Sequence, residues 1–186
     1  MPVQLESDVH MAQIIRYLSH PQVIVDPAKD VPKWSLNDVG AARVMALAAS
    51  GALLGTERIV SSGETKALET ADPLARALGC PMDVRERMHE NDRSATGFLP
   101  GAEFESAADQ FFAQPDISHL GWETARAAQR RIVAEVQTVL DQHKGANILF
   151  VGHGAVGTLL YCHLAHKPIG RAYDQGAGAG GCYLEY

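Results

Sequence analysis

The chain has 186 residues, 46% of them hydrophobic, and carries 16 Lys and Arg against 22 Asp and Glu for a formal net charge of −6. This length and composition are typical of one compact globular domain, residues 1–186, and exclude a disordered or collagen-like chain. The acidic balance argues against a nucleic-acid or anionic-membrane partner, because such surfaces attract basic proteins. An anionic ligand must therefore be bound by a local pocket.

The sequence carries no clear signal for export, membrane insertion or cross-linking. The first residues lack the basic and apolar regions of a signal peptide, and no apolar run approaches the roughly 20 residues that cross a bilayer. Cys80, Cys162 and Cys182 are odd in number and form no close pair, which argues against a disulfide framework or a zinc site. We expect a cytoplasmic protein with reduced thiols, in which residues 1–12 form a disordered tail.

Short β-rich segments alternate with longer segments of helical period, which predicts a three-layer α/β sandwich with a mostly parallel central sheet and helices on both faces. The expected strands are 14–18, 58–60, 82–84, 147–151 and 182–186, the last one antiparallel at the edge. The expected helices are 39–52, 64–78, a short one around 105–112, 122–143 and 155–164. Residues 87–115 form a long, mostly irregular segment, which is typical of a functional or mobile loop.

Two expected strands end at a histidine: residues 14–21 read IIRYLSHP and contain His20, and residues 148–154 read ILFVGHG and contain His153. Because the carboxyl ends of parallel strands line the ligand crevice, the two imidazoles are expected to face each other there. Facing histidines suit covalent phosphoryl transfer, in which one imidazole attacks phosphorus while the other helps to hold the transferring group. The alternative is that either histidine is an ordinary surface or hydrogen-bonded side chain.

Lys66 lies in the first turns of the expected helix 64–78, within the segment SSGETKALETA. The backbone N–H groups at a helix N-terminus favour anions, and an ammonium group adds a positive charge beside them. The segment therefore predicts a phosphate-binding cradle, with an ordinary solvated lysine as the alternative.

These motifs, in this order, resemble the histidine phosphatase superfamily, the phosphoglycerate-mutase-like phosphatases and mutases. Members typically show a strand that ends in Arg-His-Gly, a Pro-Leu-Thr-x-x-Gly loop, Ser-Ser-Pro-x-x-Arg-Ala-x-x-Thr-Ala, a Leu-x-Glu segment and a strand that ends in His-Gly. The corresponding segments of this chain are 18–21 (LSHP), 34–40 (WSLNDVG), 61–71 (SSGETKALETA), 88–90 (MHE) and 151–154 (VGHG). The resemblance covers nearly the whole chain in collinear order.

The resemblance implies a phosphomonoester phosphatase that forms a phosphohistidine intermediate on a small phosphorylated substrate or a phosphoprotein. It implies that His20 is the nucleophile, His153 the second pocket histidine and Glu90 the proton donor, with no metal or other cofactor. Glu90 suits this role because a carboxyl group near a partly desolvated pocket can hold a proton near neutral pH. The neighbouring Asp92 is the alternative donor.

The resemblance also implies that Lys66 binds phosphate, together with Ser19, Gly154 and a loop cation, Arg93. Two residues depart from the family pattern, since Ser19 and Lys66 stand where members usually have arginine. Arginine offers phosphate a planar, bidentate fork, whereas lysine is a point charge and serine is uncharged, so this pocket is expected to bind phosphate less firmly. Arg93 is the expected replacement cation, or else a surface arginine. The alternative function is a catalytically weak or inactive phospho-ligand-binding protein.

Three further patterns in the sequence point to other interpretations, and each is disfavoured. An alternative register aligns Arg16 with the family's arginine, but it puts a tyrosine at the nucleophile and leaves His20 unexplained. Residues 152–157 fit G-x-G-x-x-G after a strand, but too little chain follows for the βαβ unit that a dinucleotide needs. His163 and His166 are spaced to share one side of a helix, but no further ligand accompanies them, so a surface role is favoured over a metal site.

Overall fold

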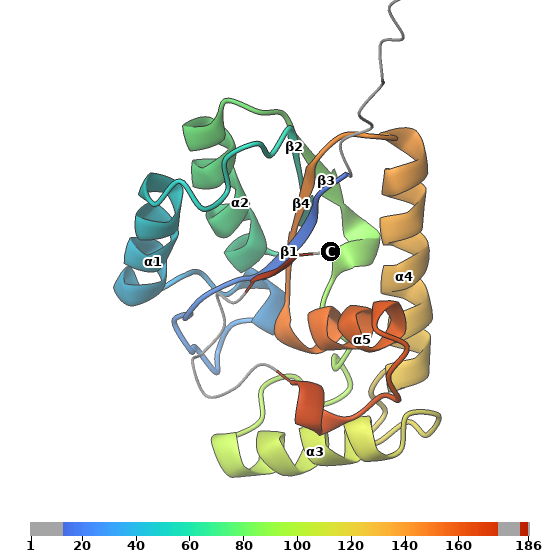
Figure 1. The fold of residues 1–186 in the computed structure, drawn as a ribbon. Helices are drawn as coiled ribbons and strands as arrows, with labels where there is room; N and C mark the ends of the chain where they lie inside the picture. Colours follow the sequence, from blue (N-terminus) through green and yellow to red (C-terminus); the bar gives the residue numbers. More distant parts are fainter. Residues whose placement is uncertain (1–12, 175–182, 186) are drawn as a thin grey trace, which may run out of the picture.

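The computed structural model describes residues 13–174 and 183–185, which fold as a central sheet between two layers of helices (Figure 1). The strands are β1 (Ile15–Ser19), β2 (Arg58–Ser62), β3 (Met82–Arg85), β4 (Ile148–Gly152) and β5 (Tyr183–Glu185). They lie in the order β3-β2-β4-β1-β5, in which the first four are parallel and β5 pairs antiparallel with β1. The prediction of an α/β fold with a mostly parallel sheet is confirmed.

The helices are α1 (Asp38–Ala49), α2 (Thr65–Leu78), α3 (Gly101–Ala113), α4 (Ala125–Gln142) and α5 (Gly154–Leu164), with short 3₁₀ turns η1 (Val31–Lys33), η2 (Glu86–Met88) and η3 (Arg171–Tyr173). In Figure 1, α1 and α2 cover one face of the sheet, α4 and α5 cover the other, and α3 lies beyond α5. None of the described helices is both long and apolar enough to cross a bilayer.

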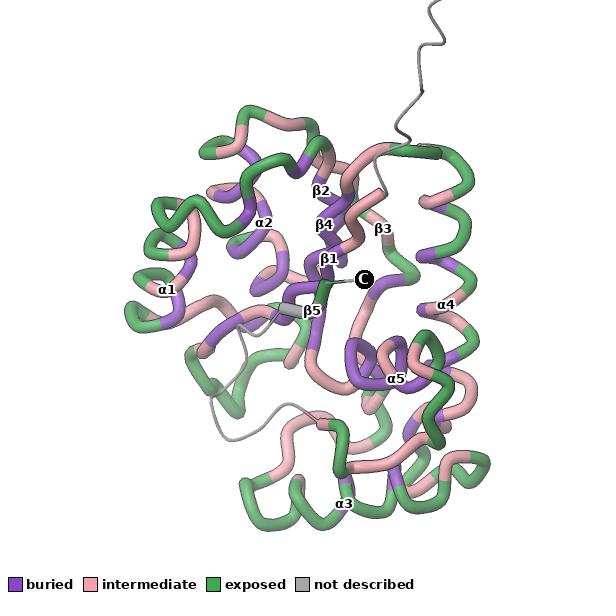
Figure 2. Tube along the Cα trace, in the orientation of Figure 1, coloured by how far each residue is buried: buried purple, intermediate pink, exposed green. Residues whose placement is uncertain are grey.

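A hydrophobic core lies on each face of the sheet, because successive strand residues point to opposite faces. On the β4 strand, Phe150 belongs to the core under α4 and α5, while Leu149 and Val151 belong to the core under α1 and α2. On β1, Tyr17 and Leu18 divide in the same way. Figure 2 shows buried residues along the strands and on the helix sides that face them. This two-sided burial fixes the strand register and therefore the position of the residues that follow each strand.

Two predicted helix starts are wrong, and some expectations lie outside the described residues. The short helix expected around 105–112 begins at Gly101, because Pro100 and Gly101 occupy the start of α3, where a helix tolerates them, rather than interrupting it. The helix expected at 122–143 begins at Ala125, with Thr124 as its N-cap accepting from the N–H of Ala127, so Trp122 is a buried loop residue. The predicted tail 1–12 and residues 175–182 and 186 are not described.

The chain after β1 is fixed against the start of α1. The side-chain oxygen of Asn37 accepts from the N–H of Gly40 at 2.8 Å, and the backbone N–H of Asn37 donates to the carbonyl of Gln22 at 3.1 Å. A Cβ added to Gly40 would lie only 2.2 Å from that carbonyl oxygen, so the position requires glycine. Asn37 is therefore the N-cap of α1, and it holds the segment that follows His20 in place.

Arg16, in the middle of β1, has its partners on the edge of the sheet. Its Nε lies 2.8 Å from the carboxylate of Glu185 on β5, and Nη1 donates to the hydroxyl of Thr56 at 3.3 Å. The buried side chain of Arg16 is thus committed to a structural pair with Glu185, which agrees with the rejection of the register that would make Arg16 a phosphate ligand.

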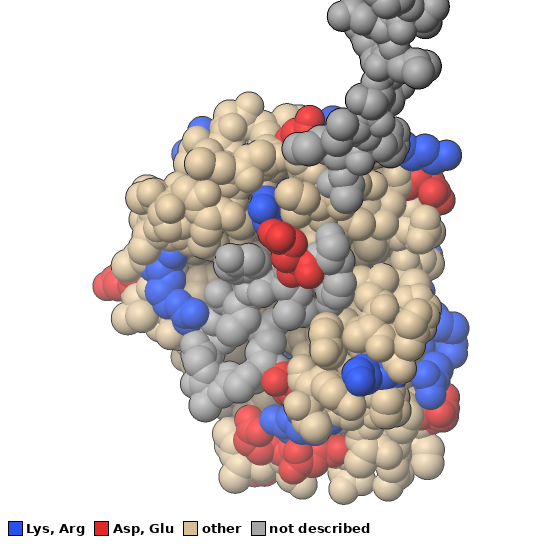
Figure 3. Space-filling view, viewed as in Figure 1, with Lys and Arg blue, Asp and Glu red and all other residues tan. Residues whose placement is uncertain are grey.

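Charged side chains of both signs lie together on the face shown in Figure 3. Along its lower edge, over α3, acidic and basic groups are adjacent, and Arg171 pairs there with Glu105 at 2.5 Å and Asp109 at 2.9 Å. Exposed pairs of this kind contribute little to stability, at most about 1 kcal/mol each.

Candidate active site

The ends of β1 and β4 bring the two predicted histidines together. The strands are parallel neighbours in which Ser19 aligns with Gly152, so His20 and His153 follow at the same edge of the sheet. The N–H of His20 donates to the carbonyl of Gly152 at 2.9 Å. The two rings lie edge to face, with their centroids 5.3 Å apart and their planes at 71°. The geometry places both imidazoles in one pocket.

The hydrogen bond of His20 determines which of its ring nitrogens carries the proton. Nδ1 lies 2.8 Å from the carbonyl oxygen of Pro21, and because a carbonyl only accepts, Nδ1 must donate. In the neutral ring, Nε2 then carries the free lone pair. Burial lowers the pKa of His20 to about 4, and the nearby Lys66 acts in the same direction. Near neutral pH, His20 is therefore an uncharged imidazole with a nucleophilic Nε2.

His153 is fully buried, and Tyr17 holds its backbone. The Tyr17 hydroxyl accepts from the N–H of His153 at 3.0 Å and donates to its carbonyl at 3.1 Å. A Cβ on Gly152 would lie 2.4 Å from the Tyr17 oxygen, and a Cβ on Gly157 would lie 2.5 Å from its ring. Two of the three glycines of the G-x-G-x-x-G pattern, Gly152 and Gly157, therefore make room for Tyr17, so these positions require glycine without a dinucleotide.

The imidazole of His153 is polar and incompletely paired. Its Nε2 lies 2.8 Å from the hydroxyl of Ser62 at the end of β2, whereas Nδ1 has no hydrogen-bond partner among the described residues. Burial lowers the pKa of His153 well below its ordinary value, so the ring is neutral near pH 7. A buried imidazole nitrogen without a partner can accept a proton from, or donate one to, a bound oxyanion.

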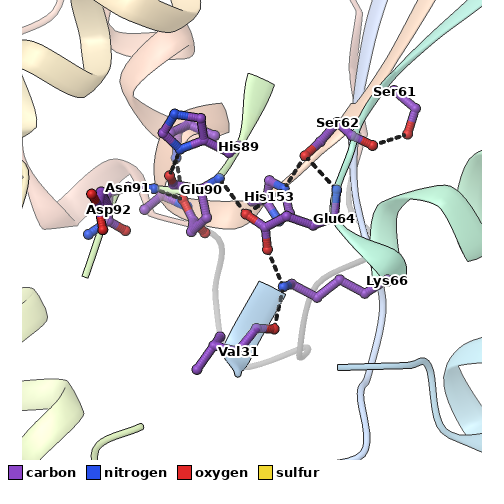
Figure 4. Close-up of polar contacts among 12 residues, drawn as sticks. Val31, Ser61, Ser62, Glu64, Lys66, His89, Glu90, Asn91, Asp92 and His153 are labelled. Carbon is purple, nitrogen blue, oxygen red and sulfur yellow. Dashed lines mark hydrogen bonds and ion pairs between the residues drawn. The ribbon is translucent and has the colours of Figure 1, made fainter. Parts of the chain in front are cut away.

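Lys66 reaches the same pocket from the first turn of α2, and Glu64 accompanies it (Figure 4). Lys66 is buried, and its ammonium donates to the carbonyl of Val31 at 3.0 Å and to the carboxylate of Glu64. The other oxygen of Glu64 lies 3.5 Å from Nε2 of His153 and accepts from the N–H of Glu90 at 2.9 Å. The predicted cation is therefore present, but a carboxylate already neutralises it.

Sequence reasoning missed Glu64. Burial alone would raise its pKa, but His153, Lys66 and the hydrogen bonds from Lys66 and from the N–H of Glu90 together lower it to about 2, so Glu64 is ionised across the physiological range. The only sequence signal was an acidic residue two positions before Lys66, which is common at the start of a helix.

The carboxyl group of Glu90 lies at the N-terminus of α5. Its oxygens accept from the N–H groups of Ala155 at 3.3 Å and Val156 at 3.2 Å. Burial nevertheless raises the pKa of Glu90. Asp92, in contrast, is exposed and accepts from the N–H of Ser94 at 2.9 Å, a bond that lowers its pKa. Of the two predicted proton donors, Glu90 has the properties of a general acid.

Arg131 of α4 supports the segment that carries Glu90. Its guanidinium donates to the carbonyls of Arg87 at 2.8 Å, His89 at 2.9 Å and Glu90 at 3.2 Å, and it pairs with Glu123 at 2.7 Å. One partly buried cation thus satisfies the carbonyls of Arg87, His89 and Glu90. This role could not be predicted from the sequence, because an arginine on a long amphipathic helix normally faces solvent.

The remaining predicted phosphate ligands, Ser19, Gly154 and Arg93, differ in burial and in their contacts. Ser19 is buried at the end of β1, and Gly154 begins α5 with open space beside its Cα. The Arg93 guanidinium lies over the ring of Phe104, 4.8 Å from its centroid, and 6.0 Å from that of Trp122. No described residue forms a hydrogen bond or ion pair with this guanidinium, so stacking positions Arg93 while its N–H groups stay available.

A cleft of about 620 Å³ opens beside these residues. Its lining includes Glu64, Glu90 and Arg93 but neither His20 nor His153. Glu64 both lines the cleft and contacts His153, so it connects the cleft with that histidine. The volume falls within the range of small-molecule sites, about 300–1,000 Å³.

The described residues hold no group of three or more His, Cys, Asp or Glu side chains arranged for a metal ion. His163 and His166 are exposed near the end of α5, consistent with the surface role favoured above.

Comparison with known proteins adds a family and a fold. The model of the histidine phosphatase superfamily (branch 1) matches residues 22–182, a range that begins after His20. The structure of Bacillus stearothermophilus YhfR is similar, with a TM-score of 0.74 and 22% sequence identity, and the match covers 85% of this chain and 82% of that chain. The structure of mycobacterial glucosyl-3-phosphoglycerate phosphatase is also similar, with a TM-score of 0.78 and 17% identity, and the match covers 93% of this chain and 89% of that chain. A third similar structure is that of Entamoeba histolytica phosphoserine phosphatase in complex with 3-phosphoglyceric acid. Its TM-score is 0.73 and its sequence identity 16%, and the match covers 94% of this chain and 90% of that chain. No curated protein matches the sequence.

Proposed function

The chain belongs to the histidine phosphatase superfamily, and we propose that it is a phosphomonoester phosphatase that works through a phosphohistidine on His20. The observation that carries this proposal is the pair of imidazoles at the ends of β1 and β4, with the Nε2 lone pair of His20 left free by the bond from Nδ1 to Pro21. A neutral imidazole held in one tautomer is ready to attack phosphorus without first losing a proton.

In the first proposed step, Nε2 of His20 forms a bond to phosphorus and the ester P–O bond breaks. Glu90, whose pKa is raised by burial, gives its proton to the departing alkoxide. In the second step, Glu90 accepts a proton from a water molecule as that oxygen attacks phosphorus. The N–P bond then breaks, inorganic phosphate leaves and His20 is regenerated.

The remaining residues are proposed to bind the negatively charged oxygens of the phosphoryl group. His153, with its unpartnered Nδ1, and the N–H of Gly154 are proposed to contact the non-bridging oxygens. Lys66 and Arg93 supply positive charge, and the buried hydroxyl of Ser19 contributes polarity where family members place an arginine. Groups fixed before the reaction stabilise the transferring phosphoryl group without reorganising. None of these steps calls on a metal ion.

We propose a small phosphorylated metabolite as the substrate. A cleft of about 620 Å³ suits a small molecule. Two similar structures are described as phosphatases of glucosyl-3-phosphoglycerate and of phosphoserine, which are small phosphate esters. A phosphoprotein is the alternative substrate.

One observation favours a second function, that of a phospho-ligand-binding protein without catalysis. The charge of Lys66 is neutralised by Glu64, and Ser19 supplies none, so the phosphoryl group meets less positive charge than two arginines would provide.

A phosphatase screen tests the proposal. Purified protein is assayed against sugar phosphates, nucleotides, phosphoamino acids and phosphohistidine peptides, with and without EDTA, and the His20→Ala variant serves as the blank. We expect EDTA-insensitive hydrolysis of at least one small phosphate ester by the wild-type protein alone. Binding of phosphate esters without hydrolysis anywhere in the screen would support the binding protein. Hydrolysis by His20→Ala at the wild-type rate would contradict both the mechanism through His20 and the binding protein without catalysis.

A further inference from the structure

We propose that Glu64 is an internal competitor of phosphate: its carboxylate occupies the position beside Lys66 and His153 that a phosphoryl group must share or take, and so limits how tightly the site binds phosphate. This inference rests on the proposed function, because it assumes that Lys66 and His153 contact the phosphoryl group. It assigns Glu64 a role in tuning affinity rather than in the chemical steps.

The contacts of Glu64 are those expected of a bound oxyanion. One oxygen accepts from the ammonium of Lys66, and the other accepts from the N–H of Glu90 at 2.9 Å and lies 3.5 Å from Nε2 of His153 (Figure 4). A cation, a backbone N–H and an imidazole are also the donors that phosphate seeks. The carboxylate is therefore bound like a ligand, and two of the residues that contact it, Lys66 and His153, are proposed to bind the substrate. Lys66 uses the same ammonium for both, whereas His153 contacts Glu64 through Nε2 and the phosphoryl group through Nδ1.

Glu64 is also placed to be displaced. It lines the cleft, whereas His153 and Lys66 are buried, so a ligand entering from the cleft meets Glu64 before either of them. The residue is followed directly by Thr65, the first residue of α2, and its own N–H is bonded to the hydroxyl of Ser62 at 3.3 Å. A rotation about the side-chain bonds can thus move the carboxylate without moving the helix.

Charge determines the direction of the effect. With Glu64 ionised, the Lys66–Glu64 pair is electrically neutral, and Arg93 is the cation in the cleft lining that has neither a hydrogen bond nor an ion pair to a described residue. Lys33, also in the lining, is paired with Asp30 at 2.7 Å. Removing the charge of Glu64 leaves Lys66 with a full positive charge toward a phosphate dianion. Attraction between groups a few ångströms apart in a partly buried site is strong enough to change affinity about tenfold or more.

A structural role for Glu64 predicts the opposite result. If the carboxylate served only to orient Lys66 and to hold the turn at Glu90, its loss would leave the Lys66 side chain without a fixed position and would weaken phosphate binding. The two roles therefore differ in sign, and a binding measurement separates them.

The experiment measures the dissociation constant of inorganic phosphate by calorimetry, at constant pH and ionic strength, for the wild-type, Glu64→Gln and Glu64→Ala proteins. Asp72→Asn is the matched control, because it removes one negative charge from the same helix at an exposed pair with Arg76. We expect Glu64→Gln to bind phosphate about tenfold more tightly or better, and Asp72→Asn to change the constant less than about twofold. Thermal unfolding checks that each variant is folded, and Glu64→Ala serves if the glutamine variant is not.

Tighter binding by Glu64→Gln or Glu64→Ala, without a matching change in Asp72→Asn, supports the inference. Unchanged or weaker binding in a folded Glu64 variant overturns it, even if the wild-type protein forms a phosphohistidine, so the proposed function can stand when this inference falls. Failure of both the wild-type and the Glu64 variants to bind phosphate at millimolar concentration overturns the inference and removes support from the proposed function together.

Discussion

The fit of Tyr17 between two glycines gives a test of how the pocket is built. A Cβ on Gly152 would meet the Tyr17 hydroxyl oxygen at 2.4 Å, and one on Gly157 would meet the ring carbon Cε1 at 2.5 Å, both well below the 3.4 Å of ordinary contact. Tyr17 is 1% exposed and bonded at its hydroxyl to both backbone polar groups of His153, so it has little freedom to retreat.

Gly152→Ala is therefore expected to destabilise the protein by about 2–4 kcal/mol, and Gly157→Ala by about 1–3 kcal/mol. Overpacking accounts for roughly 1–3 kcal/mol of this, and disturbance of the buried hydrogen bonds of Tyr17 adds about 1 kcal/mol. At Gly157, which lies within α5, the better helix propensity of alanine returns up to about 1 kcal/mol. For a chain of this size the melting temperature should fall by roughly 5–15 °C.

The two glycines can be told apart by Tyr17→Phe, which removes the oxygen but keeps the ring. In a double-mutant cycle, Tyr17→Phe should relieve the clash at Gly152 and make Gly152→Ala cost about 1–2 kcal/mol less than in the wild-type background. It should give no such relief to Gly157→Ala, whose Cβ meets the ring. Both cycles are measured by chemical denaturation.

Equal coupling in the two cycles would contradict this account of the packing. So would a Gly152→Ala protein as stable as the wild type, because the backbone would then have moved aside without cost.

Two further predictions concern the pocket itself. On the acid side of its pH profile, the kcat/KM for the best substrate of the screen, corrected for the substrate's own titration, should fall about tenfold per pH unit below pH 4. The reason is that His20 attacks only as a neutral imidazole and its pKa is lowered to about 4. An acid-side midpoint near the ordinary histidine value of about 6.5 would refute this. Arg93→Ala should weaken phosphate binding about tenfold, because one charge-assisted hydrogen bond is lost. Arg93→Lys should bind phosphate more tightly than Arg93→Ala but less tightly than the wild type, because the charge is present but the planar stacking on Phe104 is not. Calorimetry on both variants checks this, and unchanged affinity in Arg93→Ala would remove Arg93 from the site.

The sequence allowed the two histidines to be placed because their position follows from local order. A buried strand followed by a histidine predicts a side chain at the strand's carboxyl end, and parallel strands share that edge. The actual pairing of β1 with β4 brings His20 and His153 into one pocket, as expected. Lys66 was equally accessible to prediction, because its place in the first turn of α2 follows from the helix start.

Contacts between distant segments could not be predicted in the same way. Glu64 contacts Glu90 and His153, which come from two other parts of the chain, so its neighbours in the sequence reveal nothing of its environment. The partner of Arg16 could not be predicted from the sequence because Glu185 is 169 residues away. In both residues the charge was visible in the sequence, whereas the partner that determines its role depends on the tertiary fold.

The most direct test of the central claim is to trap the covalent intermediate. The best substrate is mixed with the protein and quenched within milliseconds under alkaline conditions that preserve phosphohistidine, and mass spectrometry locates the phosphate. The account predicts an acid-labile phosphoryl group on His20, present in the wild type and absent from His20→Ala, that forms and decays as fast as the substrate turns over. Phosphate on another residue, or steady hydrolysis by His20→Ala at the wild-type rate, would contradict it.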